Sequence, residues 1–312
     1  MHRYALGVDI GGTKVSVTLG NSRGKILAKK LLPTLTGKNA RQGIHDLAAA
    51  LKELKLHEGK GKKIQGIGVG VPGPMDPKKG IIEKSPHLHG WQGFPLKSFL
   101  GKKLKLPIFM ANDADAAAVG EKVFGQGHGA KNFVYVTIST GIGSGIMIDG
   151  RPLDGAAHGA GEFGHTIICP DGEKCGCGRK GCLEAYASGT AIAQYYRNIS
   201  QRTFPNVPGL TAERIAWAAK AKDRLALQAF RRAGYFLGIG LANLINLLDP
   251  ELIILGGSVI KSSEFFWPEM IESARSHSWP SLFRACRIVK TRLGNQVGDL
   301  GALALVFAHS RS

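Results

Sequence analysis

Apolar and polar positions alternate in blocks along the chain, and these blocks predict strands and helices that follow one another from end to end. Largely apolar runs at residues 4–10 and 132–138 are typical of buried strands. Further helices are expected over residues 113–124 and 223–248. Near residues 40–56 an apolar side chain recurs every three or four positions, which predicts an amphipathic helix with the stripe Ile44, Leu47, Leu51 and Leu54. Because strands and helices alternate throughout, the pattern predicts an α/β protein.

A strand, a glycine-rich turn and a returning strand occur twice in the chain, about 130 residues apart. The first copy contains GGTK at residues 11–14, which we call the first glycine turn. The second copy contains STGIGSG at residues 139–145, which we call the second glycine turn. A repeated supersecondary unit of this kind favours two similar α/β halves.

The length of the chain supports the same division, since 312 residues are more than one hydrophobic core usually serves. We expect a smaller N-terminal α/β domain formed by residues 1–111 together with about 298–312. The remaining residues, 112–297, are expected to form a larger α/β domain that contains the cysteines discussed below.

The two glycine turns are candidates for binding phosphate, because backbone amides that no Cβ obstructs can point at a single phosphate group. Asp9 precedes the first turn, where its carboxylate could hold Mg²⁺ against the same phosphates. Thr13 and Thr140 add hydroxyl donors, and Lys14 adds a positive charge. Plain hairpin turns are also rich in glycine, so the string DIGGTK at residues 9–14 is the more specific signal.

Two better-known nucleotide-binding motifs are not supported by the sequence. GVGVPG at residues 68–73 matches G-x-G-x-x-G, but that motif must open a helix, and Pro72 and Pro74 disfavour a helix start there. The sequence contains no G-x-x-x-x-G-K-[ST] string, which argues against a P-loop enzyme.

Four of the five cysteines fall within 25 residues, and three of them, Cys175, Cys177 and Cys182, form a C-x-C-x4-C pattern. One intervening residue is too short for a routine disulfide and differs from the C-x-x-C redox spacing. Three cysteines and His165 suit tetrahedral Zn²⁺, and four protein ligands leave no open position for a reactive water. The pattern therefore predicts a structural zinc site, with Cys169 as an alternative to His165 for the fourth ligand.

Asp113 stands where a strand at residues 106–110 gives way to the helix expected at residues 113–124. Ligands of open α/β sheets bind at the carboxyl ends of the strands, so this carboxylate is a candidate general base. A helix cap would require the same residue type at the same place, and the two roles can coexist.

The order of these motifs resembles that of the ROK family, whose name stands for repressors, open reading frames and kinases. The resemblance covers nearly the whole chain and is most specific in the pair E-x-G-H and C-x-C-G-x-x-G-C-x-E. It implies the two-domain, actin-like and ribonuclease-H-like fold of hexokinases, with a cleft between the domains. The motifs in chain order are DIGGTK (9–14), GVPGP (70–74), ND (112–113), STGIGSG (139–145), GEFGHT (161–166), CGCGRKGCLE (175–184) and LGGSV (255–259).

The resemblance also implies a kinase that transfers the ATP γ-phosphate to a sugar hydroxyl with Mg²⁺, and the glucokinase branch is the most similar. Asp113 would be the base that takes the proton from the sugar 6-hydroxyl. The sugar would be bound by Gly73, Asn112, Asp113, Glu162, His165 and Glu184. ATP and Mg²⁺ would be held by Asp9, Gly11, Gly12, Thr13, Lys14, Thr140, Gly141, Gly143, Gly256 and Gly257.

For the cysteines, the resemblance implies a defined set of zinc ligands, namely His165, Cys175, Cys177 and Cys182. The zinc would fix a loop flanked by Glu162 and Glu184 and so direct both carboxylates at the sugar. His165 could use one ring nitrogen for zinc and the other for a sugar hydroxyl. Cys169 and Cys286 would then be small buried hydrophobic residues.

The identity of the sugar stays open, because His87 stands where many family members carry Asn. An N-acetylhexosamine kinase, acting on N-acetylglucosamine or N-acetylmannosamine, is the alternative within the family. A regulator that responds to sugar without catalysis is the alternative if the protein is not an enzyme. The resemblance suggests a homodimer, and the lack of a visible secretory signal or membrane-length apolar run leads us to expect a cytoplasmic protein.

The net charge of +18 raises the question of a nucleic-acid partner. The basic residues are dispersed, with only short clusters at residues 60–63 and 102–105, which is typical of solvated surfaces. ROK repressors place a helix-turn-helix ahead of the first phosphate motif, whereas here that motif begins at Asp9. We therefore expect no nucleic-acid and no membrane partner, and a basic surface that attracts anionic ATP.

Overall fold

The computed structural model describes residues 3–83, 88–200 and 209–309, and the chain divides into two compact units. Unit 1 consists of Met1–Lys131, Gly145–Ala160 and Thr291–Ser312, and unit 2 consists of Asn132–Ser144 and Gly161–Lys290. Strands and helices alternate in both, which confirms the predicted α/β class. His87, the position of the departure from the family pattern, lies outside the described residues.

The observed units differ from the expected domains in that residues 112–131, 145–160 and 291–297 belong to unit 1. The first of these ranges contains residues 113–124. These residues form helix α3 (Asp113–Phe124), which packs closely on helix α10 (Val297–His309). A Cβ added to Gly120 would lie 2.9 Å from the Cα atom of Gly301, so the two glycines allow the helix backbones to touch. Local sequence does not reveal this pairing, because the two helices are far apart in the chain.

Unit 1 is built on a five-stranded sheet in which β1 is the centre, with order β3-β2-β1-β4-β7. The three N-terminal strands are antiparallel neighbours, whereas β4 and β7 run parallel to β1. The strands are β1 (Tyr4–Ile10), β2 (Lys14–Asn21), β3 (Ile26–Pro33), β4 (Ile64–Val71) and β7 (Ile108–Asn112). Two short strands, β5 (Met75–Asp76) and β6 (Ile81–Ile82), pair separately, and helices α1 (Ala40–Leu56) and α2 (Leu96–Leu104) complete the unit. No helix opens directly after β4, as the prolines in residues 68–74 predicted.

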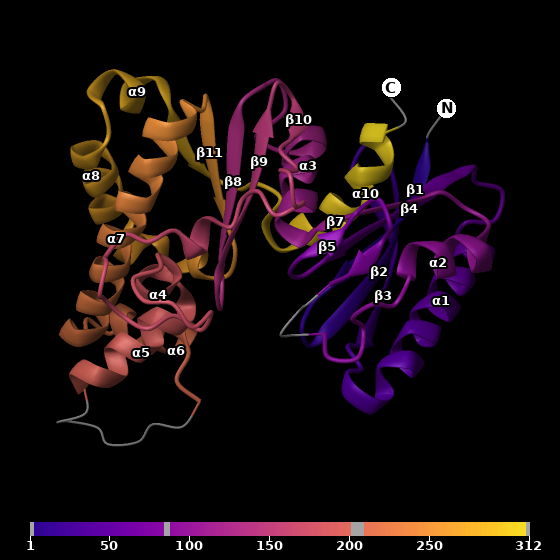
Figure 1. Ribbon diagram of the computed structural model, residues 1–312, viewed down its shortest axis with the longest axis horizontal. Helices are drawn as coiled ribbons and strands as arrows, with labels where there is room; N and C mark the ends of the chain where they lie inside the picture. The colour runs from indigo at the N-terminus through magenta and orange to yellow at the C-terminus, as the bar shows by residue number, and fades with distance from the viewer. Residues whose placement is uncertain (1–2, 84–87, 201–208, 310–312) are drawn as a thin grey trace. The chain divides into compact units, whose positions relative to one another are not determined.

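The two faces of this sheet are covered by different helices (Figure 1). Leu6 and Val8 belong to one apolar core with the α1 stripe, which includes Leu47 and Leu51. On the opposite face, α10 packs against Ala5 through a second core. Because successive strand residues point to opposite faces, Asp9 lies on the face that α10 covers.

The second sheet has the order β10-β9-β8-β11-β12, and the chain passes between the units within β9. Its strands are β8 (Phe133–Ile138), β9 (Ile142–Ile148), β10 (Arg151–Pro152), β11 (Leu252–Gly256) and β12 (Arg287–Lys290). β8 and β12 both run parallel to β11. The returning strand β9 begins at Ile142, within residues 139–145 that were expected to form the turn. The turn is shorter because Ser139 N–H donates to the carbonyl of Gly141 and closes it in three residues.

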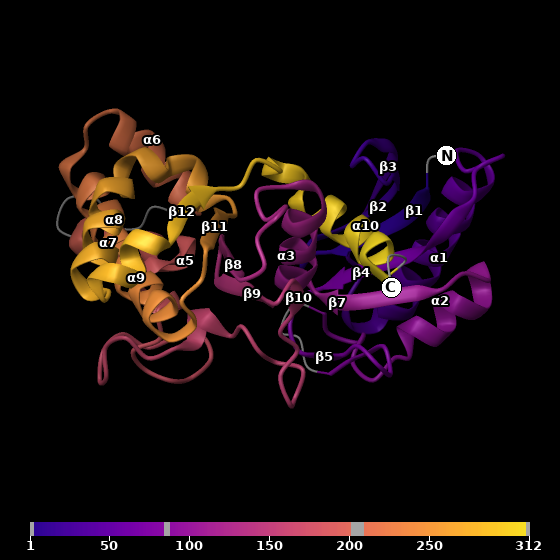
Figure 2. The same ribbon diagram turned by 90° about the horizontal axis from the view of Figure 1, so that it is seen from above.

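Unit 2 also contains a group of helices that pack around α7 (Arg224–Leu248), the helix predicted at residues 223–248. Helices α7, α8 (Trp267–His277) and α9 (Pro280–Ala285) lie together beside β11 and β12 (Figure 2). A Cβ on Gly238 would lie 2.5 Å from the carbonyl oxygen of Met270, so this glycine lets α7 and α8 approach closely. The shorter helices are α4 (Glu184–Ala187), α5 (Gly189–Ser200) and α6 (Ala212–Lys220).

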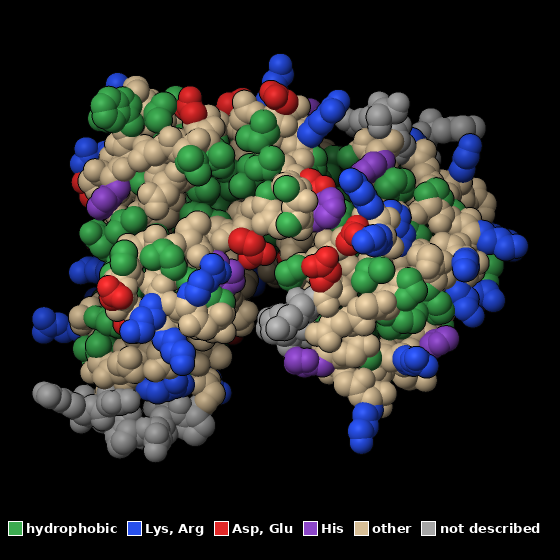
Figure 3. Space-filling view, in the orientation of Figure 1, with side chains coloured by type: hydrophobic (Ala, Val, Ile, Leu, Met, Phe, Trp, Pro, Cys, Tyr) green, Lys and Arg blue, Asp and Glu red, His purple; other side chains and the backbone are tan. Residues whose placement is uncertain are grey.

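The surface carries its basic residues in several separate groups. On the face drawn in Figure 3, Lys and Arg side chains are distributed over both units and are interspersed with acidic and apolar side chains. Within the described residues, no helix has the length and apolar character needed to cross a membrane.

Candidate active site

Two acidic side chains of unit 1 meet at the carboxyl ends of its parallel strands. Asp9 of β1 is opposite Gly70 of β4, which is opposite Ala111 of β7, two residues before Asp113. A Cβ on Gly70 would lie 3.9 Å from Asp9 Oδ1 and 3.8 Å from the Cα atom of Asp113. The glycine therefore keeps open the space that separates the two acidic residues.

Burial governs the chemistry of the Asp9 carboxyl. Desolvation raises its pKa to about 6, and the neighbouring carboxylates of Asp299 and Asp113 act in the same direction. Lys29 and Lys14 oppose this effect. A buried carboxylate with further negative charge beside it suits a divalent cation, which would favour its ionised form.

Asp299 was missed by sequence reasoning, although it lies close to the candidate magnesium ligand. It is 3% exposed, and it accepts hydrogen bonds from the Ser16 hydroxyl at 2.5 Å and from Lys29 Nζ at 2.5 Å. The residue before it, Gly298, is in the first turn of α10, where an added Cβ would collide with the Asp9 carboxylate. An Asp in the first turn of a helix is an ordinary helix-start signal, so nothing local distinguishes it.

The helix cap at the start of α3 is Asn112, and this leaves the neighbouring carboxylate exposed. Asn112 Oδ1 accepts from the backbone N–H of Ala114 at 2.9 Å, and its Nδ2 donates to the carbonyl of Gly73 at 3.2 Å. Gly73 has φ of 86°, a conformation that favours glycine. Asp113 is exposed, and one of its oxygens also lies 2.8 Å from the N–H of Ala114. The candidate base is thus presented to solvent by a capped helix.

The first glycine turn is closed by its own backbone. Gly11 N–H donates to the carbonyl of Lys14 at 2.9 Å, and the Thr34 hydroxyl donates to the carbonyl of Gly11 at 2.7 Å. Gly12 and Thr13 are exposed between these bonds. The turn is therefore ordered by its ends, while its tip is accessible to a phosphate.

In unit 2, residues 162–184, which we call the cysteine segment, bring four predicted ligand atoms together. The ligand atoms of His165, Cys175, Cys177 and Cys182 all lie within 4.8 Å of one another. Cys177 Sγ is 3.7 Å from Cys182 Sγ, and Cys175 Sγ is 3.8 Å from His165 Nδ1. Tetrahedral zinc with Zn–S bonds of about 2.3 Å separates two sulfurs by about 3.8 Å, so the cluster is compatible with a structural zinc ion.

The thiols of this cluster experience different surroundings. Hydrogen bonds from Arg179 lower the pKa of Cys177 to about 6, which favours the thiolate that a metal requires. Burial raises the pKa of Cys175 to about 12. Cys169, the alternative ligand, is not part of the four-residue group and is half-buried, whereas Cys286 is buried as expected.

The two glutamates that flank the cysteines differ in how firmly they are held. Glu184 Oε2 accepts from the backbone N–H of Ile142 at 2.8 Å, and its other oxygen is 3.8 Å from Cys175 Sγ. A Cβ on Gly141 would collide with Glu184 Oε2, so the glutamate packs directly on the second glycine turn. Glu162 is exposed, with Oε2 at 3.9 Å from His165 Nε2, on the ring edge away from the thiols. Unit 2 therefore brings Glu162, His165 and Glu184 together beside the cluster.

A cavity of about 480 Å³ opens beside the second glycine turn, and apart from Thr140 its lining residues were not foreseen from the sequence. Ser139 and Thr140 of the turn line it, and so does Ser258, directly after the glycine pair at residues 256–257. Gly257 has φ of 91°, and a Cβ there would collide with the carbonyl of Ile138, so it serves close backbone packing. The other lining residues include Thr190, Arg197, Trp217, Lys220 and Lys261.

The cavity has the features of a nucleotide site, with hydroxyls and cations near a glycine turn and an aromatic side chain. Trp217 is 63% exposed on helix α6, and an exposed tryptophan on an otherwise amphipathic helix is the sequence signal that could have indicated it. The cationic residues are scattered in the sequence and come together only through the packing of α5, α6 and the segment after β11.

The architecture is similar to that of solved sugar kinases. The chain is 32% identical to a ROK hexokinase from Thermus thermophilus, with a TM-score of 0.86 over 99% of both chains. It is 32% identical to a ROK family glucokinase from Streptomyces griseus, solved with glucose and AMPPNP, with a TM-score of 0.80 over 97% of this chain and 98% of that one. The fold is therefore the two-domain, actin-like α/β fold of the ROK hexokinases.

The chain belongs to the ROK family, which it matches over residues 5–309. Among curated relatives, a glucokinase from Halalkalibacterium halodurans is 35% identical over 97% of this chain and 95% of its own length. A xylose repressor from Caldicellulosiruptor bescii is 32% identical over 97% of this chain and 78% of its own length. The similarity to glucokinases and hexokinases supports a sugar kinase that uses ATP.

Proposed function

We propose that the protein transfers the γ-phosphate of ATP to the 6-hydroxyl of glucose, with Asp113 as the general base. The observation that carries this proposal is the exposed carboxylate of Asp113 beside half-buried Asp9, at the strand ends where the first glycine turn begins. A carboxylate at the attacking oxygen contributes about 10²–10⁴-fold to the rate. A regulator that only binds sugar has no need of this pair together with two phosphate turns.

Phosphoryl transfer depends mainly on positioning and on charge neutralisation. Mg²⁺, when bound, would neutralise charge on the ATP phosphates, and the carboxyl groups at hand for it are Asp9 and its neighbour Asp299. Gly12 and Thr13 are exposed residues, and their backbone amides suit phosphate oxygens, as does the Thr140 hydroxyl. The cavity lined by Thr140 and Trp217 would take the nucleoside.

The sugar would be recognised by Glu162, His165 and Glu184, whose oxygens and ring nitrogen suit the hydroxyls of a hexose. His165 presents Nδ1 to Cys175 and Nε2 to Glu162, so one nitrogen can serve the metal and the other the sugar. Asn112 retains donor capacity beyond its bond to Gly73, because a side-chain amide carries two N–H groups. The zinc would act only by fixing these groups in place.

The proposal is tested by a coupled assay of ADP formation with glucose, mannose, fructose, N-acetylglucosamine and N-acetylmannosamine at equal concentrations. We expect the highest kcat/KM for glucose, and glucose 6-phosphate as the product by NMR. A clear preference for an N-acetylated sugar would assign the protein to the alternative activity. Sugar binding without phosphorylation of any of the five would refute the kinase assignment.

A further inference from the structure

The cysteine segment rests on one stripe of helix α7. Arg232, Phe236 and Gly240 are spaced four residues apart, so their side chains lie on the same face of the helix. Phe236 packs on Tyr186 with ring centroids 4.3 Å apart. A Cβ on Gly240 would lie 2.6 Å from Leu183 and 2.9 Å from Phe163, the residues adjacent to the two flanking glutamates. This face of α7 is therefore the platform on which the segment is held.

Arg232 makes most of the polar and aromatic contacts of that platform. Its guanidinium carbon is 4.3 Å from the ring centre of Tyr195, 4.9 Å from that of Tyr186 and 5.2 Å from that of Phe236. Its Nη2 also lies 3.2 Å from Glu173 Oε1, and the arginine side chain is only 19% exposed. A planar guanidinium can stack on rings and bind a carboxylate at once, which a lysine ammonium cannot.

Arg232 contacts the chain on both sides of the thiols, at Glu173 within the cysteine segment and at Tyr186 just after it. Glu173 lies two residues before Cys175, and Tyr186 lies two residues after Glu184. The two are tied to each other, since the N–H of Glu173 donates to the Tyr186 hydroxyl at 2.6 Å. The carbonyl of Glu173 in turn accepts from the N–H of Gly181 at 2.9 Å, the residue before Cys182. A displacement of Glu173 would therefore move backbone that carries thiols.

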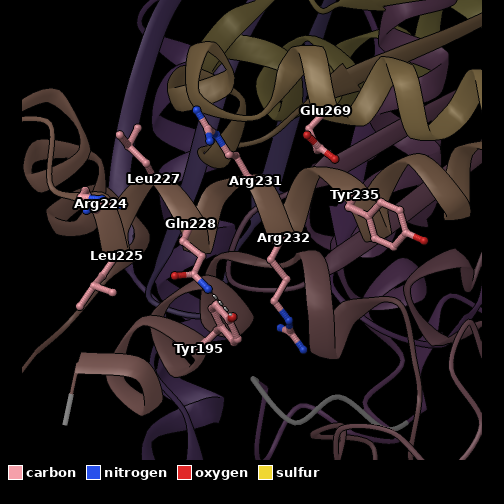
Figure 4. A pocket seen from close by; sticks show the side chains of 9 residues that line it. All are labelled: Tyr195, Arg224, Leu225, Leu227, Gln228, Arg231, Arg232, Tyr235 and Glu269. Atoms are coloured by element: carbon pink, nitrogen blue, oxygen red, sulfur yellow. Dashed lines mark hydrogen bonds between the residues drawn. The ribbon is translucent and has the colours of Figure 1, made fainter. Parts of the chain in front are cut away.

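We propose that Arg232 is a positioning residue that fixes the cysteine segment on α7 and so maintains the geometry of the metal cluster and of Glu184. Arg232 is not a member of the four-residue cluster, and it acts through its contacts with Glu173 and Tyr186. Figure 4 shows that Arg231 and Arg232 leave adjacent positions of α7 in different directions, with Arg232 on the side of Tyr195. Tyr195 is itself held by a hydrogen bond from Gln228 at 3.3 Å, so the aromatic partner is in a defined position.

The experiment compares Arg232→Gln with Arg232→Lys and with the control Arg231→Gln, which removes an exposed arginine from the next position of the same helix. Each purified protein is loaded with Zn²⁺, and release of the metal to a chromogenic chelator is followed in stopped flow. Loss of a group that orients metal ligands typically weakens metal binding about 10–100-fold, so we expect release from Arg232→Gln to be at least about tenfold faster than from wild type. The rate of zinc release from Arg232→Lys should lie between those of wild type and Arg232→Gln. The rate from Arg231→Gln should match wild type.

The steady-state readout rests on the proposed kinase activity, whereas metal release does not. We expect Arg232→Gln to raise KM for the sugar more than KM for ATP, because Glu184 is one of the residues proposed to bind the sugar. Metal release and sugar KM equal to those of Arg231→Gln would overturn the proposal, as would a wild-type protein that neither contains nor binds Zn²⁺. If the wild-type protein has no kinase activity but zinc release is accelerated in Arg232→Gln, the proposed function is refuted and the positioning role of Arg232 is retained.

Glu173→Gln replaces Arg232→Gln in these measurements if the latter does not fold. This change removes the charge that Arg232 binds and leaves its contacts with the three rings. Release faster than in Arg231→Gln supports the proposal, and release at the same rate overturns it. Far-ultraviolet circular dichroism of every variant confirms that equal folded fractions are compared.

Discussion

The acidic strand edge of unit 1 and the cysteine segment of unit 2 carry different candidate residues, and different interactions hold these residues in place. Asp9 and Asp113 stand at the ends of hydrogen-bonded parallel strands and at the start of capped α3. The cysteine segment contains one 3₁₀ turn and isolated bridges, with no long strand. Its local backbone hydrogen bonds are supplemented by side chains, namely the cluster of His165 and three thiols and the contacts of Arg232.

This difference predicts how each region responds to substitution. Along the acidic edge, a side chain can be changed while the backbone that presents it stays in the sheet, so chemistry should be lost without loss of fold. In the cysteine segment, side chains hold the backbone in place in addition to its short-range hydrogen bonds, so one substitution should affect metal content, stability and sugar affinity together.

The largest effect is expected for Asp113→Asn. The amide cannot accept the proton of the sugar hydroxyl, so we expect kcat to fall by about 10²–10⁴-fold, with KM for ATP and the melting temperature close to those of wild type. Glu58→Gln, which neutralises an exposed carboxylate of the same unit, is the control. Near-normal turnover of Asp113→Asn would refute its assignment as the base.

Cys177→Ser is expected to lose bound zinc and most of the activity, and to melt at a lower temperature, since removal of one of four ligands also releases the loop. Zinc content by atomic absorption and differential scanning calorimetry measure these changes. Cys169→Ser is the matched control and should keep the metal, because Cys169 lies outside the four-residue group. The opposite result, zinc kept in Cys177→Ser and lost in Cys169→Ser, would exchange their roles.

A smaller effect is expected for Gly141→Ala, which tests the contact between the second glycine turn and Glu184. The added methyl collides with Glu184 Oε2, so the carboxylate must move and KM for the sugar should rise. Gly176→Ala is the control, because a Cβ there meets no atom within 4 Å. Equal sugar KM in the two variants would show that Glu184 does not need its present position.

The smallest effect concerns the cap of α3. Asn112→Ala removes one of the two acceptors near the N–H of Ala114, since Asp113 Oδ1 is the other, and it also removes the donor to Gly73. It should lower the free energy of unfolding by about 1 kcal/mol. Asn112→Asp keeps an acceptor for the cap and loses the donor to Gly73, so it should be nearly as stable as wild type. Urea unfolding of both variants distinguishes the contribution of the bond to Ala114 from that of the bond to Gly73. An equal loss of stability in the two variants would mean that the bond to Gly73 contributes most.

Sequence patterns predicted the elements well where a period or a motif was strong. The helices at residues 113–124 and 40–56 were expected within a residue or two of α3 and α1, because an alanine-rich or amphipathic run has a clear start and end. The returning strand after the second glycine turn was expected too late, since the three-residue closure at Ser139 depends on one backbone hydrogen bond. The unit to which α3 belongs could not be predicted, because it depends on contact with the distant α10.

By itself, the sequence determined the α/β class, the two glycine turns and the clustering of thiols near His165, because each of these is local in the chain. Only the tertiary structure decided which side chains surround them. Asp299 and Gly298 reach Asp9 from the last helix, and Arg232 reaches Glu173 and Tyr186 from α7. The physical reason is that burial, charge interactions and ring contacts require residues to be close in space. Residues far apart in the chain come close together only when the sheets and helices have packed.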